Sequence, residues 1–305
     1  MTEPAADLAA TSFSGALGED AGDRPLLVRV ITPHSGLEGL KSAAISLRRD
    51  FRQARHLAWR FFLRDVRAEH RQSLLGYAWL VFPALANTLV WVFLNDQKLV
   101  NIDSGQVPYP LFVLTGTILW TAFTATLTAL LGVVSTARSV LAKVNFPQEA
   151  LVYAAFLRAS VDSGITSILL VPAFILFSAP AQPEMLLFPL AILGSLLLGA
   201  AIALLILPIA VLYSDIGRGI HLLLRFGFFL TPIIFMLPAS GIARRVMLLN
   251  PATPIVATGR GWLTNSGEAM PGAFIVVITS CLILAGIGLL IYKVALPHLI
   301  ERIGE

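Results

Sequence analysis

The stretch that decides the fold is MLLFPLAILGSLLLGAAIALLILPIAVL, from Met185 to Leu212, and it contains no charged side chain. A helix needs roughly 20 predominantly apolar residues to cross the hydrocarbon core of a bilayer. This run exceeds that length, and its two prolines, Pro189 and Pro208, favour a tilt or a kink. The stretch therefore predicts a membrane-spanning helix.

Five further apolar runs surround this one along the chain. All but one of them reach or nearly reach the spanning length, and the run that begins at Leu222 is short. The pattern predicts an all-α, polytopic membrane protein with six transmembrane helices, in which the stretch quoted above is span four. The other spans are Leu74 to about Asn95, Tyr109 to Val134, about Ala159 to Phe177, about Leu222 to Leu237, and Gly272 to Tyr292.

The composition of the whole chain agrees with a lipid environment. Of its 305 residues 56% are hydrophobic and 13% are charged, and the mean hydropathy is +0.79. Soluble domains carry roughly a quarter charged residues. We attribute the net charge of +4 to residues that orient the chain in the bilayer and contact anionic membrane lipids. No nucleic-acid partner is expected. The single cysteine, Cys281, forms no intrachain disulfide and no cysteine-rich metal site.

The chain before the first span divides into two parts. Residues 1–45 are rich in Ala, Gly, Asp and Ser, and we expect a disordered cytoplasmic extension. They contain no apolar run long enough for a signal peptide, so span one is expected to target the chain. Residues 46–73 are strongly basic and predict an amphipathic interface helix at the membrane surface. Its basic stripe consists of Arg60, Arg64, Arg67 and Arg71, and its apolar stripe of Trp59, Phe62 and Val66.

The positions of Lys and Arg predict the orientation of the chain. With the N-terminus in the cytoplasm and six spans, 18 of the 22 Lys and Arg residues lie inside. Both termini are therefore expected to be cytoplasmic, with residues 74–295 as the transmembrane domain and 296–305 as a cytoplasmic tail. Short apolar stretches between Pro238 and Pro271 predict re-entrant or interfacial helices after span five. The four Lys and Arg residues expected on the external side are Lys98, Arg244, Arg245 and Arg260.

Several kinds of chemistry lack their motifs. The chain has no P-loop, no HExxH or other His and Cys cluster with metal spacing, and no Gly-x-Ser-x-Gly. Spans one, two, four and six contain no ionisable side chain, which disfavours ion coupling; Asp162 and Arg225 lie near span ends, where snorkelling or interfacial pairing explains them. Glu268 is the only carboxylate of the external loop, which disfavours a membrane enzyme. No catalytic, cofactor or metal site is expected in this chain.

Spans one, two and five are rich in aromatic and hydroxyl side chains. Sugars stack their C–H faces on aromatic rings, so these spans form a candidate channel for a glycan. Ordinary helix packing and an interfacial aromatic belt are the alternative explanation. Packing is the sufficient account of the small residues Ser195, Gly199 and Ala203 in span four. The candidate channel residues are Trp91, Trp120, Phe123, Phe226, Phe229 and Phe235.

Four segments in order carry a family resemblance. They resemble the membrane subunits of type-2 ABC transporters that export polysaccharides such as O-antigen, capsule and teichoic acid. The resemblance covers roughly residues 55–302, and no single segment is specific alone. The segments are Arg64 to Trp79 (RDVRAEHRQSLLGYAW) with Pro83, Val144 to Pro147 with Glu149, Asp215 to Arg218, and Phe228 to Phe235 followed by Leu249 to Pro251.

The resemblance implies a homodimeric permease of the bacterial cytoplasmic membrane that moves a lipid-linked polysaccharide. ATP and Mg would be bound by a separate nucleotide-binding subunit, on which the interface helix and the cytoplasmic loops dock. A channel along the dimer axis would be lined by spans one, two and five. The residues implied in coupling to the ATPase are Arg138, Lys143, Phe146, Pro147, Glu149, Asp215 and Arg218.

Three alternatives stay open at this point. A permease of the same type for a drug or a lipid differs from a polysaccharide exporter only through the family resemblance. An integral membrane glycosyl- or acyltransferase would need an acidic or histidine cluster in the external loop. A structural or assembly subunit fits the basic helix and the short cytoplasmic loops less well.

Overall fold

A computed structural model describes residues 54–67, 76–137 and 147–303, with residue 214 and residues 296–303 described by their backbone alone. Within these ranges the ordered elements are helices, and no β-strand is present. The predicted all-α class is therefore confirmed. The expected extension at 1–45, the basic residue Arg71 and the coupling residues Arg138, Lys143 and Phe146 lie outside the described residues.

Five helices of the described chain are long and apolar enough to cross a membrane. They confirm five of the predicted spans and identify a multi-pass membrane protein. Span three is divided by a break between α6 and α7, and a short helix α4 (Val133–Thr136) follows span two. The elements are α2 (Ala78–Asp96), α3 (Tyr109–Leu131), α6 (Glu149–Ser167) with α7 (Leu170–Leu176), η1 (Pro183–Leu187) with α8 (Phe188–Leu212), and α12 (Pro271–Ile303), whose spanning part ends at Ala295.

The predicted fifth span is wrong as a single helix from Leu222 to Leu237. The helix here is α9 (Ser214–Phe229), which begins earlier and contains 16 residues, about 24 Å in length. It ends before Thr231 and Pro232 because proline disfavours helical backbone at the preceding residue and lacks an amide donor. The apolar chain that follows is irregular. Apolar composition alone therefore predicted a helix that extends too far towards Leu237.

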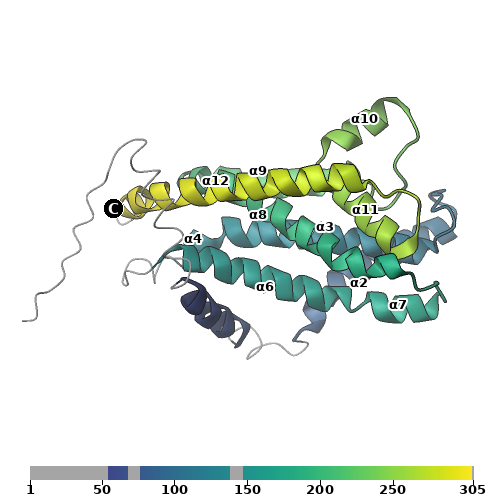
Figure 1. The fold of residues 1–305 in the computed structure, drawn as a ribbon, viewed down its shortest axis with the longest axis horizontal. Helices are drawn as coiled ribbons and strands as arrows, with labels where there is room; N and C mark the ends of the chain where they lie inside the picture. The colour runs from purple at the N-terminus through teal and green to yellow at the C-terminus, as the bar shows by residue number, and fades with distance from the viewer. Residues whose placement is uncertain (1–53, 68–75, 138–146, 304–305) are drawn as a thin grey trace, which may run out of the picture. The chain divides into compact units, whose positions relative to one another are not determined.

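Two short helices occupy the predicted external loop. Helix α10 (Gly241–Leu249) has no buried residue and stands away from the long helices (Figure 1). Helix α11 (Ala252–Thr264) is buried along most of its length and packs against α3, α8 and η1. The prediction of short helices after span five is confirmed, and re-entry into the membrane stays a prediction.

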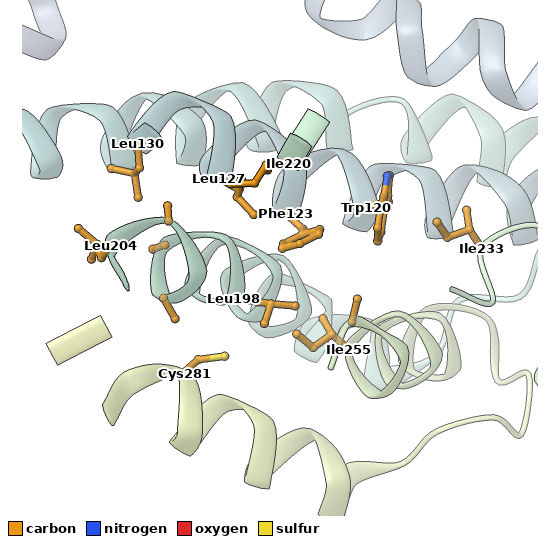
Figure 2. Close-up of a cluster of buried hydrophobic side chains, with 14 of the residues drawn as sticks. Trp120, Phe123, Leu127, Leu130, Leu198, Leu204, Ile220, Ile233, Ile255 and Cys281 are labelled. Atoms are coloured by element: carbon orange, nitrogen blue, oxygen red, sulfur yellow. The ribbon is translucent and has the colours of Figure 1, made fainter. Parts of the chain in front are cut away.

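Helices α3 and α8 form the centre of the fold, and α12 runs beside α8 (Figure 1). Gly199 permits this packing, because a Cβ atom there would lie 2.5 Å from the Phe123 carbonyl oxygen. Ser195 and Ala203 on the same face are buried, so the small-residue stripe serves helix packing. Figure 2 shows part of the core, with Trp120, Phe123, Leu127 and Leu130 of α3, Leu198 and Leu204 of α8, Ile255 of α11 and Cys281 of α12.

A helix is present at 54–67, inside the predicted interface helix. Its buried residues Ala54 and Ala58 pack against Ala150 and Ala154 of α6, where small side chains let the two helices approach closely. The basic side chains Arg60, Arg64 and Arg67 are exposed. Of the predicted apolar stripe, Phe62 is buried and Trp59 is 52% exposed. The amphipathic interface helix and its contact with a membrane surface stay predictions.

Candidate functional site

Helices α2, α3 and α9 enclose a groove of about 940 Å³. Each helix contributes one face, so the groove joins three segments that are far apart in the sequence. A ligand pocket for a molecule of drug size has a similar volume. The groove is lined by Asn87, Val90 and Trp91 of α2, Trp120, Thr124, Ala125 and Thr128 of α3, and His221, Leu224, Arg225, Phe228 and Phe229 of α9.

The aromatic end of the groove consists of Trp91, Trp120, Phe228 and Phe229. The Trp91 and Phe229 ring centroids lie 6.4 Å apart, and those of Trp120 and Phe228 lie 6.2 Å apart, both in edge-to-face geometry. Gly227 lets α9 approach Trp120, because an added Cβ would lie 3.1 Å from the edge of that indole ring. The four rings thus form a fixed surface of aromatic faces and edges.

The cationic end of the groove contains Arg225, with His221 one turn earlier on α9. At about 100° per residue, these positions share one face of α9 with Phe228 and Phe229. Among the described residues that line the groove there is no Asp or Glu. The nearby Thr128 hydroxyl donates to the Thr124 carbonyl oxygen at 2.9 Å, so its lone pairs stay available as acceptors. This end therefore presents positive charge without a balancing carboxylate.

The structure brings together half of the predicted channel residues. Trp91, Trp120 and Phe229 line the groove together. Phe123 is buried in the core, Phe235 packs partly buried against that core, and Phe226 is 60% exposed outside the groove lining. The sequence interpretation missed His221 and Arg225, although their spacing to Phe228 and Phe229 was the available signal.

A second charged cluster, the Arg260 cluster, joins α11 and α3 to the irregular chain after α9. It comprises Arg260, Glu268, Phe112 and the carbonyl groups of Pro232 and Ile233. Arg260 is 0% exposed. Its Nη1 donates to Glu268 Oε2 at 2.9 Å, and its Nη2 donates to the Pro232 and Ile233 carbonyl oxygens at 2.5 and 3.0 Å. The guanidinium carbon lies 3.5 Å from the centroid of the Phe112 ring.

These contacts satisfy the backbone that α9 leaves open. Carbonyl groups without a helical partner are costly away from water, and Arg260 supplies the missing donors. Burial lowers the pKa of Arg260 to about 10, against the raising effect of Glu268, and the guanidinium stays charged at neutral pH. Glu268 therefore has a structural partner. The sequence did not predict this ion pair. It showed only that Arg260 and Glu268 belong to the same loop.

A hydrogen bond joins the two parts of the fourth segment that carries the family resemblance. Asn250 Nδ2 donates to Thr231 Oγ1 at 2.7 Å, and Asn250 Oδ1 accepts from the Ala252 amide at 3.0 Å. The Thr231 hydroxyl in turn donates to the Gly227 carbonyl oxygen at 2.8 Å. The end of α9 is thereby tied to the start of α11.

The predicted coupling residues fall in different environments. Glu149 is buried at the start of α6, after Pro147, and forms an ion pair of 2.8 Å with Lys293 of α12. Asp215 and Arg218 form an exposed ion pair of 3.3 Å in the first turns of α9. Glu149 thus holds two helices together, whereas the α9 pair is accessible. A role in docking stays a prediction for all of these residues.

The remaining charge inside a candidate span is also paired. Asp162 accepts from Arg158 Nε at 2.8 and 2.9 Å, one turn apart on α6, which confirms pairing as the explanation of Asp162. In the part of the chain that the structure describes, no group of three His, Cys, Asp or Glu side chains could hold a metal ion. Arg158, Arg260 and Glu149 therefore take part in structural ion pairs, whereas Arg225 has no charged partner within the described chain.

Comparison with known proteins gives one informative similarity. No family model matches the chain. Over 219 residues the chain is 26% identical to the O-antigen export system permease protein RfbA of Myxococcus xanthus, an alignment that covers 70% of this chain and 82% of that protein. This similarity confirms the resemblance that the four sequence segments indicated. The chain is thus a distant homologue of an O-antigen export permease.

Proposed function

We propose that this chain is the membrane-spanning permease subunit of an ATP-driven exporter that moves a lipid-linked polysaccharide across the bacterial cytoplasmic membrane. The observation that carries the proposal is the groove between α2, α3 and α9, which combines fixed aromatic rings with hydroxyl groups. Such a surface suits a chain of sugars, because stacking on aromatic faces tolerates movement from one sugar to the next. The similarity to the RfbA permease supports the same conclusion.

The proposal completes the membrane topology with α9. Its 16 residues and the irregular chain up to Leu237 together form the sixth crossing. Irregular backbone at membrane depth is tolerated where protein buries it, and the Arg260 cluster supplies that burial. Six crossings place both termini in the cytoplasm, together with the α8–α9 connection that holds Asp215 and Arg218. Helices α10 and α11 are then the external, re-entrant elements.

A nucleotide-binding subunit is the energy source in this proposal. It docks on the cytoplasmic segment around 138–149, on the start of α9 and on the helix at 54–67. The ion pair between Glu149 and Lys293 links the first of these contacts to α12. Movement of the ATPase would thereby reach the long C-terminal helix as a rigid-body displacement. No ATP or Mg site is assigned to the permease itself.

A second copy of the permease completes the transporter in this proposal. Helix α2 has few buried residues and exposes the large apolar side chains Trp79, Phe82, Leu89 and Phe93. A membrane protein presents such a face to lipid or to another subunit. In a homodimer the groove of each copy would open towards a shared path.

Reconstitution tests the proposed function. The permease is purified with the ATP-binding protein encoded beside its gene, and placed in liposomes that contain the host's radiolabelled lipid-linked polysaccharide. We expect ATP-dependent protection of the label, which is lost when the P-loop lysine of the partner is changed to alanine. Transport of a fluorescent phospholipid or an apolar drug without transport of the polysaccharide would establish the alternative permease function instead.

A further inference from the structure

Arg225 is exposed to the groove, and its surroundings differ from those of Arg158 on α6 and Arg260 on α11. Arg158 has Asp162 at 2.8 Å, and Arg260 has Glu268 at 2.9 Å. In the part of the chain that the structure describes, neither an ion pair nor a hydrogen bond engages Arg225, and the groove lining contains no carboxylate. The groove therefore contains an uncompensated positive charge.

The position of Arg225 along α9 makes this charge costly. Arg225 lies 11 positions after Ser214, about 16 Å along the helix axis. A cation at membrane depth is unfavourable unless it is paired or faces a polar path. His221 is one turn earlier on the same face and also lines the groove. The charge of Arg225, with the imidazole of His221 beside it, indicates a ligand that brings the negative charge.

The neighbouring side chains restrict the chemistry of that ligand. Phe228 follows Arg225 by three residues, so an aromatic face lies within about 5 Å along the axis. The guanidinium group offers several N–H donors in a planar arrangement that matches phosphate oxygens. A ligand that fills both ends of the groove thus carries a phosphate directly beside a ring that stacks on aromatics.

We propose that His221 and Arg225 form an anion subsite that binds the phosphate group of a phosphate-linked glycan, while Trp91, Trp120, Phe228 and Phe229 stack the adjoining sugar. The inference rests on the proposed function in taking this ligand to be the transported substrate. The subsite explains why α9 has positive charge and aromatic rings on a single face. It also assigns a binding role to an arginine for which helix packing provides no partner.

The test measures ligand binding by the permease–ATPase complex in nanodiscs of phosphatidylcholine. Quenching of tryptophan fluorescence is a suitable signal because Trp91 and Trp120 line the groove. The probe is a farnesyl-diphosphate-linked N-acetylglucosamine, and the phosphate-free farnesyl glycoside is its matched control. The variants are Arg225→Gln, the charge-preserving Arg225→Lys, His221→Gln, and Arg245→Gln on the exposed helix α10 as a control.

The subsite predicts that Arg225→Gln weakens binding of the diphosphate probe roughly 10- to 100-fold, the effect of losing charge-assisted hydrogen bonds. His221→Gln weakens binding less than Arg225→Gln does. Arg225→Lys retains part of the affinity, and Arg245→Gln binds the probe like the wild type. The phosphate-free glycoside binds all variants equally. Equal loss of both ligands in Arg225→Gln, or unchanged affinity for the diphosphate probe, would overturn the subsite.

Anionic lipid is the other source of a phosphate group, and the same assay separates it. Nanodiscs with phosphatidylglycerol should leave the affinity for the probe unchanged. If that lipid abolishes probe binding as strongly as Arg225→Gln does, the groove holds a lipid headgroup and the proposal fails. Arg225-dependent binding without polysaccharide transport in liposomes would reject the proposed function alone. Transport with Arg225-independent binding would reject the subsite alone.

Discussion

The Arg260 cluster and the groove each contain one arginine, but the two arginines have opposite surroundings. Arg260 is 0% exposed and contacts a carboxylate, two carbonyl oxygens and an aromatic ring. Arg225 is exposed to the groove, where the lining contains no acid. The comparison teaches that the pairing of a charge, rather than its presence in an apolar segment, separates a structural role from a binding role.

The largest expected effect is on the stability of the Arg260 cluster. Arg260→Met should destabilise the folded permease by about 3–5 kcal/mol, because it removes the cation that pairs with the buried Glu268 carboxylate and leaves Glu268 Oε2 and two carbonyl groups without their donor. Thermal unfolding of the detergent-solubilised protein, followed by size-exclusion chromatography, measures this loss. The double variant Arg260→Met with Glu268→Gln should be more stable than the single variant, and a single variant as stable as the wild type would contradict the structural role.

A steric change in the same cluster should have the next largest effect. A Cβ at Gly116 would lie 2.8 Å from the Ile233 carbonyl oxygen and 2.9 Å from Arg260 Nη2. Gly116→Ala should therefore cost about 1–3 kcal/mol of stability through forced displacement. Gly164→Ala on α6 is the control, since an added Cβ there meets no atom within 4 Å. Equal melting temperatures of the two variants would show that the cluster adapts freely.

A charge change in the groove should lower export and leave the stability of the protein unchanged. Arg225→Gln should leave the melting temperature of the complex near that of the wild type, because no contact within the described chain depends on the guanidinium group. Polysaccharide export in liposomes should fall in parallel with the loss of probe affinity. A variant that unfolds like Arg260→Met would place Arg225 in the structural class and remove the contrast.

The smallest expected effect concerns the aromatic end. Trp91→Ala should lower the export rate about 2- to 10-fold, corresponding to one lost aromatic contact. Ile175→Ala on α7 is the control, since Ile175 is 75% exposed and does not line the groove. Export should be unchanged in Ile175→Ala. Equal rates for both variants would refute stacking of the substrate on Trp91.

Hydropathy predicted most of the fold because the length of an apolar run is a local property. It failed at the fifth span, where Thr231-Pro232 ends α9 although the apolar composition continues. The sequence also indicated Trp91, Trp120 and Phe229, since aromatic residues in spans one, two and five are visible without coordinates. Phe123 carried the same signal but faces the core. Amino-acid composition does not predict which face of a helix packs against the neighbouring helices.

The charged groups show the same limit. Arg225 was explained by its nearness to a span end, and only the groove reveals that it lacks an acidic neighbour. Arg260 and Glu268 are eight residues apart, so neither helical nor strand spacing predicts their contact. The family resemblance had placed Thr231 and Asn250 in the two parts of one segment, and only the structure shows the hydrogen bond between them. Tertiary contacts thus supplied the roles of residues that the sequence had only placed in segments.

Photocrosslinking of a stalled transporter tests the central claim, that the groove between α2, α3 and α9 holds the substrate. A benzophenone amino acid is introduced at Trp91 or at Phe93, in a complex whose ATPase partner binds but does not hydrolyse ATP. If the groove holds the substrate, irradiation should attach the radiolabelled lipid-linked polysaccharide to position 91, with little label at position 93. Label at position 93 with none at position 91 would contradict the claim.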